Sequence, residues 1–205
     1  MATTVVTFHD ALSPWGEWLV VAHFGRVWRP YRAVVGIGFV PYSTGGRWLY
    51  TDHGWIFDSD WEWGAITFHY GRWLWLGDEE GWVWVPDTVW GPAWVEWRYG
   101  AGFVGWVPLP PPGVTVVFTA YWPRWSFVEL RHFPHGRHHR HLVPDHRATA
   151  VYEMTAPLPA PHASSAAGPP PGEVAGVAAV DLSPVRLEPP KPPGAKPKPV
   201  KPKTP

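Results

Sequence analysis

The amino-acid sequence predicts an all-β protein made of repeated antiparallel, Trp-rich hairpins that form a barrel or a two-sheet sandwich. Residues 1–152 show almost no helical periodicity, whereas short aromatic and β-branched runs are broken every 8 to 12 residues by Gly, Pro, Asp or His. All 17 tryptophans lie between Trp15 and Trp125. An internal repeat of short Trp-containing motifs supports the same fold class.

The repeat consists of four motifs that each place Trp at the third position. They are Gly-Glu-Trp at 16–18, Gly-Arg-Trp at 46–48, Gly-Arg-Trp at 71–73 and Val-Glu-Trp at 95–97, and they begin 30, 25 and 24 residues apart. A turn and a second aromatic run follow each motif. Each unit is therefore expected to form one β-hairpin.

The register of each hairpin follows from the position of its turn, because residues that face each other in an antiparallel pair keep a constant sum of their numbers. The first unit, 18–28, needs an odd-length loop around His23. In the fourth unit, a turn centred on 101–102 sets Trp97 opposite Trp106.

The second and third units are predicted to pair aromatic residues across the hairpin, with turns centred on 52–53 and 78–79. The pairs are Trp48 with Phe57, Tyr50 with Trp55, Trp73 with Trp84, and Trp75 with Trp82. Such a pair contributes roughly 0.2 to 1 kcal/mol. Both faces of the third hairpin are apolar, so we expect one face in the core and the other against a neighbouring repeat, a partner or a ligand.

The chain is expected to continue in strands after the fourth unit. Residues 114–122 and 125–130 have strand composition and flank a tight turn at 123–124, and another short strand is expected at 147–154. These elements complete a predicted Trp-rich β domain over residues 8–152.

Residues 153–205 are predicted to form a Pro/Ala/Gly-rich tail that is mostly disordered and ends in an extended Lys-Pro segment. Fifteen of the 27 prolines and all five lysines follow Tyr152, and no aromatic residue does. Such a composition buries too little apolar surface to offset the entropy of ordering. Within the tail, 171–180 and 184–187 are candidates for a helical turn and a strand that dock on the domain.

Composition excludes several classes of function. The absence of cysteine rules out disulfides, Cys-ligated zinc, iron-sulfur clusters and thiol nucleophiles. Lys and Arg total 17 and so do Asp and Glu, so no basic excess favours nucleic acid. No apolar run is long enough for a transmembrane helix, and residues 1–14 show no signal peptide. The Gly-x-Gly-x-x-Gly match at 100–105 is interpreted as turn glycines, and no cofactor is expected.

Aromatic residues of the second and third hairpins are the candidate ligand-binding platform, because exposed indoles stack on sugar rings or on proline-rich peptides. The candidate platform residues are Trp48, Tyr50, Trp55, Trp73, Trp75, Trp82 and Trp84. The alternative is that these rings fill the core.

A segment rich in His and Arg over residues 131–147 is a second candidate site. Imidazoles bind zinc, nickel or copper, and guanidinium groups bind anions. The candidate metal ligands are His135, His138, His139 and His141, and the candidate anion-binding residues are Arg131, Arg137, Arg140 and Arg147. A solvated basic loop is the alternative interpretation.

Acidic residues cluster at Asp58, Asp60 and Glu62 and again at 78–80. Paired carboxyls beside Trp residues are what a glycoside hydrolase uses. Acidic hairpin tips also keep aromatic hairpins soluble and block edge pairing. We predict no catalytic residues and keep a hydrolase as an alternative.

Four runs carry a family resemblance. They are His-Tyr-Gly-Arg-Trp at 69–73, Gly-Trp-Val-Trp-Val-Pro at 81–86, Trp-Gly-Pro-Ala-Trp-Val at 90–95 and Gly-Trp-Val-Pro-Leu-Pro at 105–110. In this order they resemble an uncharacterised family of Trp-rich bacterial proteins, over roughly residues 8–152. Members are often predicted to be exported, and many carry a FecR-like domain upstream. The resemblance implies the bacterial periplasm or cell surface and no mechanism.

The expected function is a non-enzymatic interaction or structural module of the bacterial cell envelope. Its exposed aromatics would bind a cell-wall glycan or an envelope protein. The alternatives are a glycan-cleaving hydrolase, a periplasmic metal-binding or anion-binding protein, and a homo-oligomer whose second apolar face closes on another copy.

Overall fold

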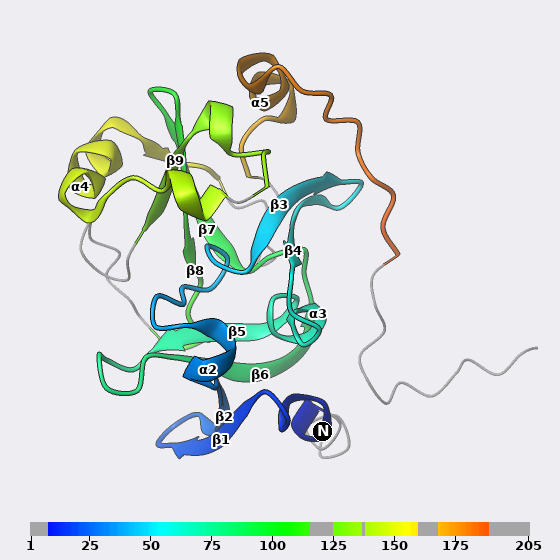
Figure 1. Ribbon diagram of the computed structural model, residues 1–205, viewed down its shortest axis with the longest axis vertical. Coiled ribbons are helices and arrows are strands. Elements are labelled where there is room, and N and C mark those ends of the chain that lie inside the picture. The colour runs from blue at the N-terminus through cyan, green and yellow to red at the C-terminus, as the bar shows by residue number, and fades with distance from the viewer. Residues whose placement is uncertain (1–7, 115–124, 137, 160–167, 189–205) are drawn as a thin grey trace, which may run out of the picture.

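The computed structural model describes residues 8–114, 125–136, 138–159 and 168–188. Within them lie two four-stranded antiparallel sheets and a two-stranded ribbon (Figure 1). The strands are β1 (Gly16–Val21), β2 (Gly25–Pro30), β3 (Gly46–Thr51), β4 (Gly54–Ser59), β5 (Tyr70–Trp75), β6 (Trp82–Trp90), β7 (Val95–Gly100), β8 (Phe103–Pro108), β9 (Ser126–Glu129) and β10 (Ala156–Pro157). The all-β prediction is confirmed.

Short helices connect and cover the strands. They are α2 (Arg32–Val35), α3 (Gly64–Thr67), α4 (Asp145–Met154), α5 (Pro171–Ala178) and the 3-10 turns η1 (Leu130–His132) and η2 (His138–His141), and residues 8–12 form a further helical turn. No helix in the described part of the chain has both the length and the apolar character needed to span a membrane.

The sheets are open. Strand order is β1-β2-β6-β5 in the first sheet and β10-β7-β8-β9 in the second, while β3 and β4 form a two-stranded sheet. None of the sheets formed by the described strands closes into a barrel. In Figure 1 the first sheet lies at the bottom, and the ribbon and the second sheet lie above it.

The predicted hairpin registers are confirmed. In β5–β6, Trp73 faces Trp84 and Trp75 faces Trp82. The remaining predicted pairs are present as well, namely Trp48 with Phe57, Tyr50 with Trp55, and Trp97 with Trp106. The odd-length loop of the first hairpin centres on His23, which has a φ of 69°. Gly100 and Gly102 of the 100–105 motif build the β7–β8 turn, whereas Gly105 lies within β8 opposite Arg98.

The Gly of the Gly-x-Trp motif leaves room for an aromatic ring of the opposite strand to lie on its backbone. A Cβ atom at this position would sit far inside van der Waals contact with that ring. The contacts would be Gly16 with Trp28 (2.6 Å), Gly46 with Phe57 (2.7 Å) and Gly71 with Trp84 (2.8 Å). Each Gly-x-Trp motif therefore brings two rings together. One is the ring of its own Trp, and the other is the ring of the opposite residue, which leans diagonally over the motif Gly.

Aromatic rings form the core between the ribbon and the two sheets. Trp48 of the ribbon lies 4.6 Å from Trp97 and 5.6 Å from Trp106 of the second sheet, measured between ring centroids. On the other side of the core, Trp28 contacts Trp63 edge to face at 5.1 Å. Such edge-to-face pairs add roughly 0.5 to 1.5 kcal/mol to the free energy gained by burial itself.

The predicted strand at 147–154 is wrong, because these residues belong to helix α4. Ala148 and Val151 are its buried residues, and they pack against Trp125 and Phe127. Their spacing of three residues fits one face of a helix and not the alternation of a strand. Of the strands predicted around the turn at 123–124, β9 is present, and residues 115–124 lie outside the described residues.

The predicted tail is not disordered over residues 168–188. Helix α5 buries Val174 completely, and Val185 forms a parallel bridge with Thr51 of β3. Strand β10, which also follows residue 152, pairs with β7. The helical turn predicted within 171–180 is thus confirmed as α5, whereas 184–187 forms no strand and contacts β3 through the single bridge at Val185.

Candidate functional site

Most of the predicted aromatic platform is core. The four rings of Trp48, Trp55, Trp73 and Trp84 are at most 1% exposed, and Trp82 is 7% exposed. A ring enclosed on both faces has no surface on which to stack a ligand from solvent, so the expectation of a surface platform is corrected for the first four. Tyr50 and Trp75 are half-buried.

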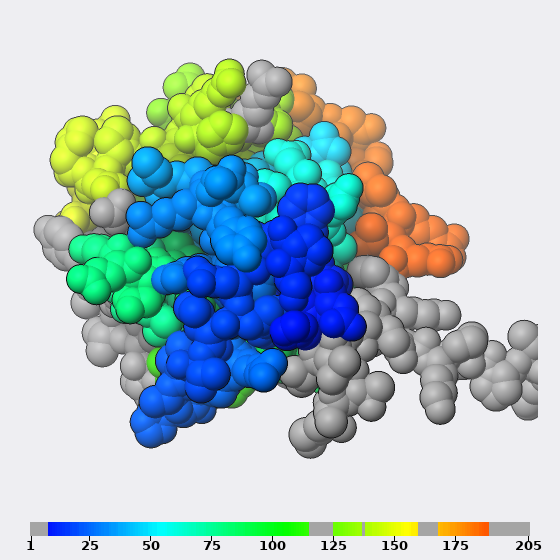
Figure 2. All heavy atoms as spheres, turned by 60° about the horizontal axis from the view of Figure 1, so that its bottom comes forward, coloured from blue at the N-terminus to red at the C-terminus, as the bar shows by residue number. Residues whose placement is uncertain are grey.

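Of the three remaining platform residues, Trp75 and Trp82 line a pocket of about 510 Å³. The pocket lies between hairpin β1–β2, helix α2 and the tip of hairpin β5–β6. Figure 2 shows this side of the molecule, where the blue segment of the first forty residues meets the green hairpin tip. The aromatic and charged residues that line the pocket are Glu17, Arg29, Tyr31, Arg32, Phe39, Trp75, Asp78, Glu79, Glu80 and Trp82.

The pocket opens where β2 separates from β6. These strands pair at Trp28 and Trp84, so the next position at which β2 could pair with β6 on the same face is Pro30, opposite Trp82. Proline has no N–H to donate, and the ladder ends there. The chain turns into α2 instead, which leaves a space beside the tip of the β5–β6 hairpin.

Aromatic rings provide the apolar wall of the pocket. Trp75 and Trp82 meet edge to face with centroids 5.5 Å apart, and Tyr31 is 44% exposed. Phe39 is half-buried and packs edge to face on the core residue Trp73 at 5.3 Å. The apolar wall is therefore anchored in the core.

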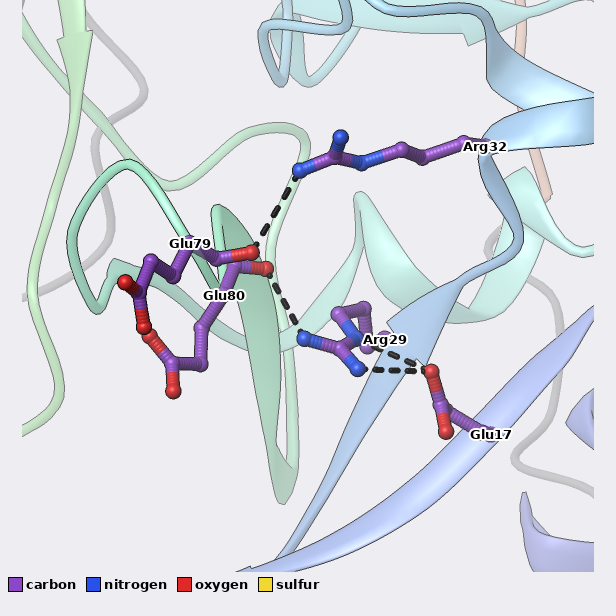
Figure 3. A network of polar contacts seen from close by, with 5 residues as sticks. All are labelled: Glu17, Arg29, Arg32, Glu79 and Glu80. Atoms are coloured by element: carbon purple, nitrogen blue, oxygen red, sulfur yellow. Dashed lines mark hydrogen bonds and ion pairs between the residues drawn. The ribbon is translucent and has the colours of Figure 1, made fainter.

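Two arginines tie the hairpin tip to β2 and α2 (Figure 3). Arg29 donates to the Glu17 carboxylate at 2.8 and 3.0 Å and to the Glu80 carbonyl oxygen at 3.3 Å. Arg32 donates to the Glu79 carbonyl oxygen at 3.3 Å. The carboxylates of Glu79 and Glu80 point away from both guanidinium groups. The pocket thus combines oriented donors with carboxylate acceptors.

The His/Arg segment does not assemble the predicted metal site. His138 is fully buried, with its ring edge to face on Trp106 at 5.3 Å, and burial lowers its pKa to about 4. His141 stacks instead on His132, whose ring centroid lies 4.1 Å away. His135 and His139 are exposed. Across the described residues, no three His, Asp or Glu side chains form a group that could hold a metal ion.

The predicted anion-binding arginines that the structure describes lie on three elements, Arg131 on η1, Arg140 on η2 and Arg147 on α4. Arg131 pairs with Glu129 at 2.7 Å. Arg140 and Arg147 are exposed, and Arg137 lies outside the described residues.

The acidic cluster at Asp58, Asp60 and Glu62 does not line the pocket. Asp58 accepts a hydrogen bond from Arg47 Nε at 2.9 Å, while Asp60 and Glu62 are exposed. The other acidic group, 78–80, does reach the pocket.

Sequence reasoning missed most of the pocket lining, including Glu17, Arg29, Tyr31, Arg32 and Phe39. The signal available was the run Arg-Pro-Tyr-Arg at 29–32, which ends a strand at proline and presents two cations and a ring. Its partner across the pocket lies some fifty residues away in the chain, and no local pattern shows that pairing.

A family model described as a family of unknown function, DUF6600, matches residues 9–113. The chain belongs to this family. The DUF6600 match includes every pocket residue and the four hairpins, and it ends before β9, α4 and α5. No curated protein and no solved structure matches the chain. The predicted membership of an uncharacterised family is confirmed.

Proposed function

We propose that this DUF6600 protein is a non-enzymatic binding module that takes a sugar unit of a cell-envelope glycan in the Trp75–Trp82 pocket. The observation that carries the proposal is the pocket itself, whose volume of about 510 Å³ is combined with a wall of aromatic rings and a rim of charged groups. Ligand pockets of roughly 300 to 1,000 Å³ with a few placed polar groups are typical of small-molecule sites.

Sugars need both kinds of surface that the pocket offers. The apolar face of a sugar ring stacks on an indole, and its hydroxyl groups each donate and accept hydrogen bonds. Trp75 is the half-buried indole of the wall, and Arg32 and the carboxylate of Glu79 supply a donor and an acceptor at the rim.

The geometry supports binding without rearrangement. Hydrogen bonds from Arg29 and Arg32 hold the hairpin tip, and Phe39 rests on the core, so the pocket walls are formed before a ligand arrives. A preformed site loses less conformational entropy on binding. The family resemblance to exported bacterial proteins supports the cell envelope as the compartment in which such a glycan would be met.

Isothermal titration of the full chain tests the proposal, with soluble peptidoglycan fragments and chitooligosaccharides as probes and dextran as a neutral glucan control. We expect saturable binding of at least one amino-sugar probe, a loss of at least tenfold in affinity for Trp75→Ala, and no release of new reducing ends. Trp90→Ala is the matched control, because Trp90 is a half-buried indole of the same hairpin outside the pocket. Equal losses for both variants, or no binding of any probe, would contradict the proposal.

A further inference from the structure

The segment 168–188 returns to the β3–β4 ribbon (Figure 1, orange) and pairs with it through one bridge, between Val185 and Thr51. Val185 N donates to the Tyr50 carbonyl oxygen at 3.0 Å, and Asp52 N donates to the Val185 carbonyl oxygen at 3.2 Å. The pairing is parallel. An extended peptide that bonds to the edge of a sheet in this way is held through its backbone.

Side chains at the ribbon turn extend this contact by two residues. The Asp52 carboxylate accepts a hydrogen bond from Leu187 N at 3.1 Å. The Leu187 carbonyl oxygen lies 3.1 Å from Nε2 of His53. The end of the ribbon therefore binds both polar groups of a second tail residue.

In the first part of the segment, residues 168–174, the fit of the segment to the domain depends on which side chains it carries. Trp55 Nε1 donates to the Pro169 carbonyl oxygen at 2.8 Å, and a Cβ atom on Gly168 would lie 2.5 Å from the Trp55 ring. Val174 of α5 is fully buried in the main core cluster, and the Tyr99 hydroxyl donates to the Glu173 carboxylate. A residue larger than Gly or a polar residue at these two buried positions would not fit.

We propose that the β3 edge, Trp55 and Tyr99 form a peptide-binding site, that residues 168–188 are its tethered ligand, and that the same segment of a second copy of this chain occupies it by exchange. The site is matched to this segment at Gly168 and Val174, and every copy of the chain carries the segment. An exchanged segment makes every contact that the tethered one makes, which is why domain swapping is an accessible route to dimers.

Few side chains of the segment are buried, which makes exchange accessible. Val174 is the fully buried residue of α5, and most of residues 181–188 are exposed. The β-pairing consists of one bridge.

The experiment mixes two full-length variants. Val174→Asp weakens the segment and leaves the receiving surface free. Asp52→Pro damages the receiving surface and leaves the segment intact, because it removes both the N–H and the carboxylate that bind the tail. Asp52 begins the turn and does not have a positive φ, so proline is compatible with its backbone.

We expect each variant alone to be monomeric by light scattering and the equimolar mixture to contain a one-to-one dimer. Gly176→Ala is the matched control on α5, since a Cβ there meets nothing within 4 Å. Mixed with Asp52→Pro, it should yield at least tenfold less dimer. A mixture that stays monomeric while both variants keep their near-ultraviolet circular dichroism overturns the proposal.

A second measurement applies if either variant fails to fold. A specific protease site placed between Pro159 and Gly168 of the otherwise unchanged chain allows the segment to be cut free. The cut segment should co-elute with the domain, and an excess of isotope-labelled synthetic peptide 168–188 should replace it, whereas the same peptide with Val174→Asp should not. A cut segment that separates from the domain and does not rebind contradicts the proposal.

Discussion

The hairpins β3–β4 and β5–β6 have the same design and different surroundings. Each places one aromatic pair near its base and a second pair near its tip. Both base pairs are core. The tip pairs differ, because Trp55 is covered by Gly168 and Pro169 of the same chain, whereas Trp75 and Trp82 line the pocket.

The difference shows that register decides which residues face each other, while the rest of the chain decides which of them are accessible. A Trp-rich hairpin is therefore compatible with a core or with a binding site. What distinguishes a core hairpin from a binding site is whether another segment covers the aromatic pair at its tip. The tail covers Trp55, whereas β2 departs at Pro30 and leaves Trp75 and Trp82 beside the pocket.

The largest expected effect on stability is the difference between the aromatic pair at the base of β5–β6 and the pair at its tip. Trp84 is fully buried, with its Nε1 donating to the Tyr70 carbonyl oxygen, whereas Trp75 is half-buried. We predict that Trp84→Ala lowers the free energy of unfolding by about 3 to 5 kcal/mol and Trp75→Ala by less than about 2 kcal/mol. Urea denaturation measures both. Equal losses would erase the distinction between the two pairs.

Acid should weaken the core through His138, which packs against the β3–β4 ribbon residue Phe57. Burial lowers its pKa from 6.5 to about 4, so the unfolded chain takes up the proton first. The stability contributed by neutral, buried His138 is complete above pH 6.5 and is lost as pH falls to about 4. The loss amounts to about 3 kcal/mol of the free energy of unfolding.

The variant His138→Phe keeps an aromatic ring there and should remove that part of the acid sensitivity. Unfolding by urea at pH 7 and pH 4 measures it, with His135→Ala as the exposed control. If the free energy of unfolding falls by the same amount between pH 7 and pH 4 in the wild-type chain and in His138→Phe, His138 is not the source of the acid sensitivity.

The motif glycine should matter for the same reason in both hairpins. A Cβ on Gly46 would lie 2.6 Å from the Asp58 carbonyl oxygen and 2.7 Å from the Phe57 ring. Gly46→Ala is predicted to cost about 2 kcal/mol through overpacking. Gly176→Ala in helix α5 should instead stabilise by about 0.5 to 1 kcal/mol, and thermal melts compare them. A neutral Gly46→Ala would refute the diagonal ring packing.

The smallest effect on stability is expected at the pocket rim. The Glu17 and Arg29 side chains are 44% and 28% exposed, so Glu17→Gln should change the free energy of unfolding by less than about 1 kcal/mol. The same change should weaken glycan binding, because it removes the carboxylate that orients Arg29. Loss of stability without loss of binding would make this ion pair structural.

Hairpin registers were predictable from sequence because they depend on the turn and the two runs beside it. The Trp73–Trp84 and Trp75–Trp82 pairs followed from the turn position alone. Helix α4 was missed because its buried residues contact Trp125 and Phe127 and its own periodicity is weak.

The pocket and the burial of His138 depend on long-range packing. Arg29 bonds to Glu80 across some fifty residues, and His138 meets Trp106 and Phe57 from a loop. Local sequence patterns give composition and periodicity, and neither of these shows which distant residue a side chain will contact. Trp75 and Trp84 were both named as candidate platform residues from the sequence, and their different burial could be told apart only from the position of β2.

The most direct test of the central claim is the ¹⁵N-indole spectrum of the full chain during titration with the amino-sugar probe that binds. We expect the indole signals of Trp75 and Trp82 to shift with the probe, while those of Trp73 and Trp84 stay in place. Shifts at Trp73 and Trp84, or an unchanged Trp75 signal at saturation, would contradict it.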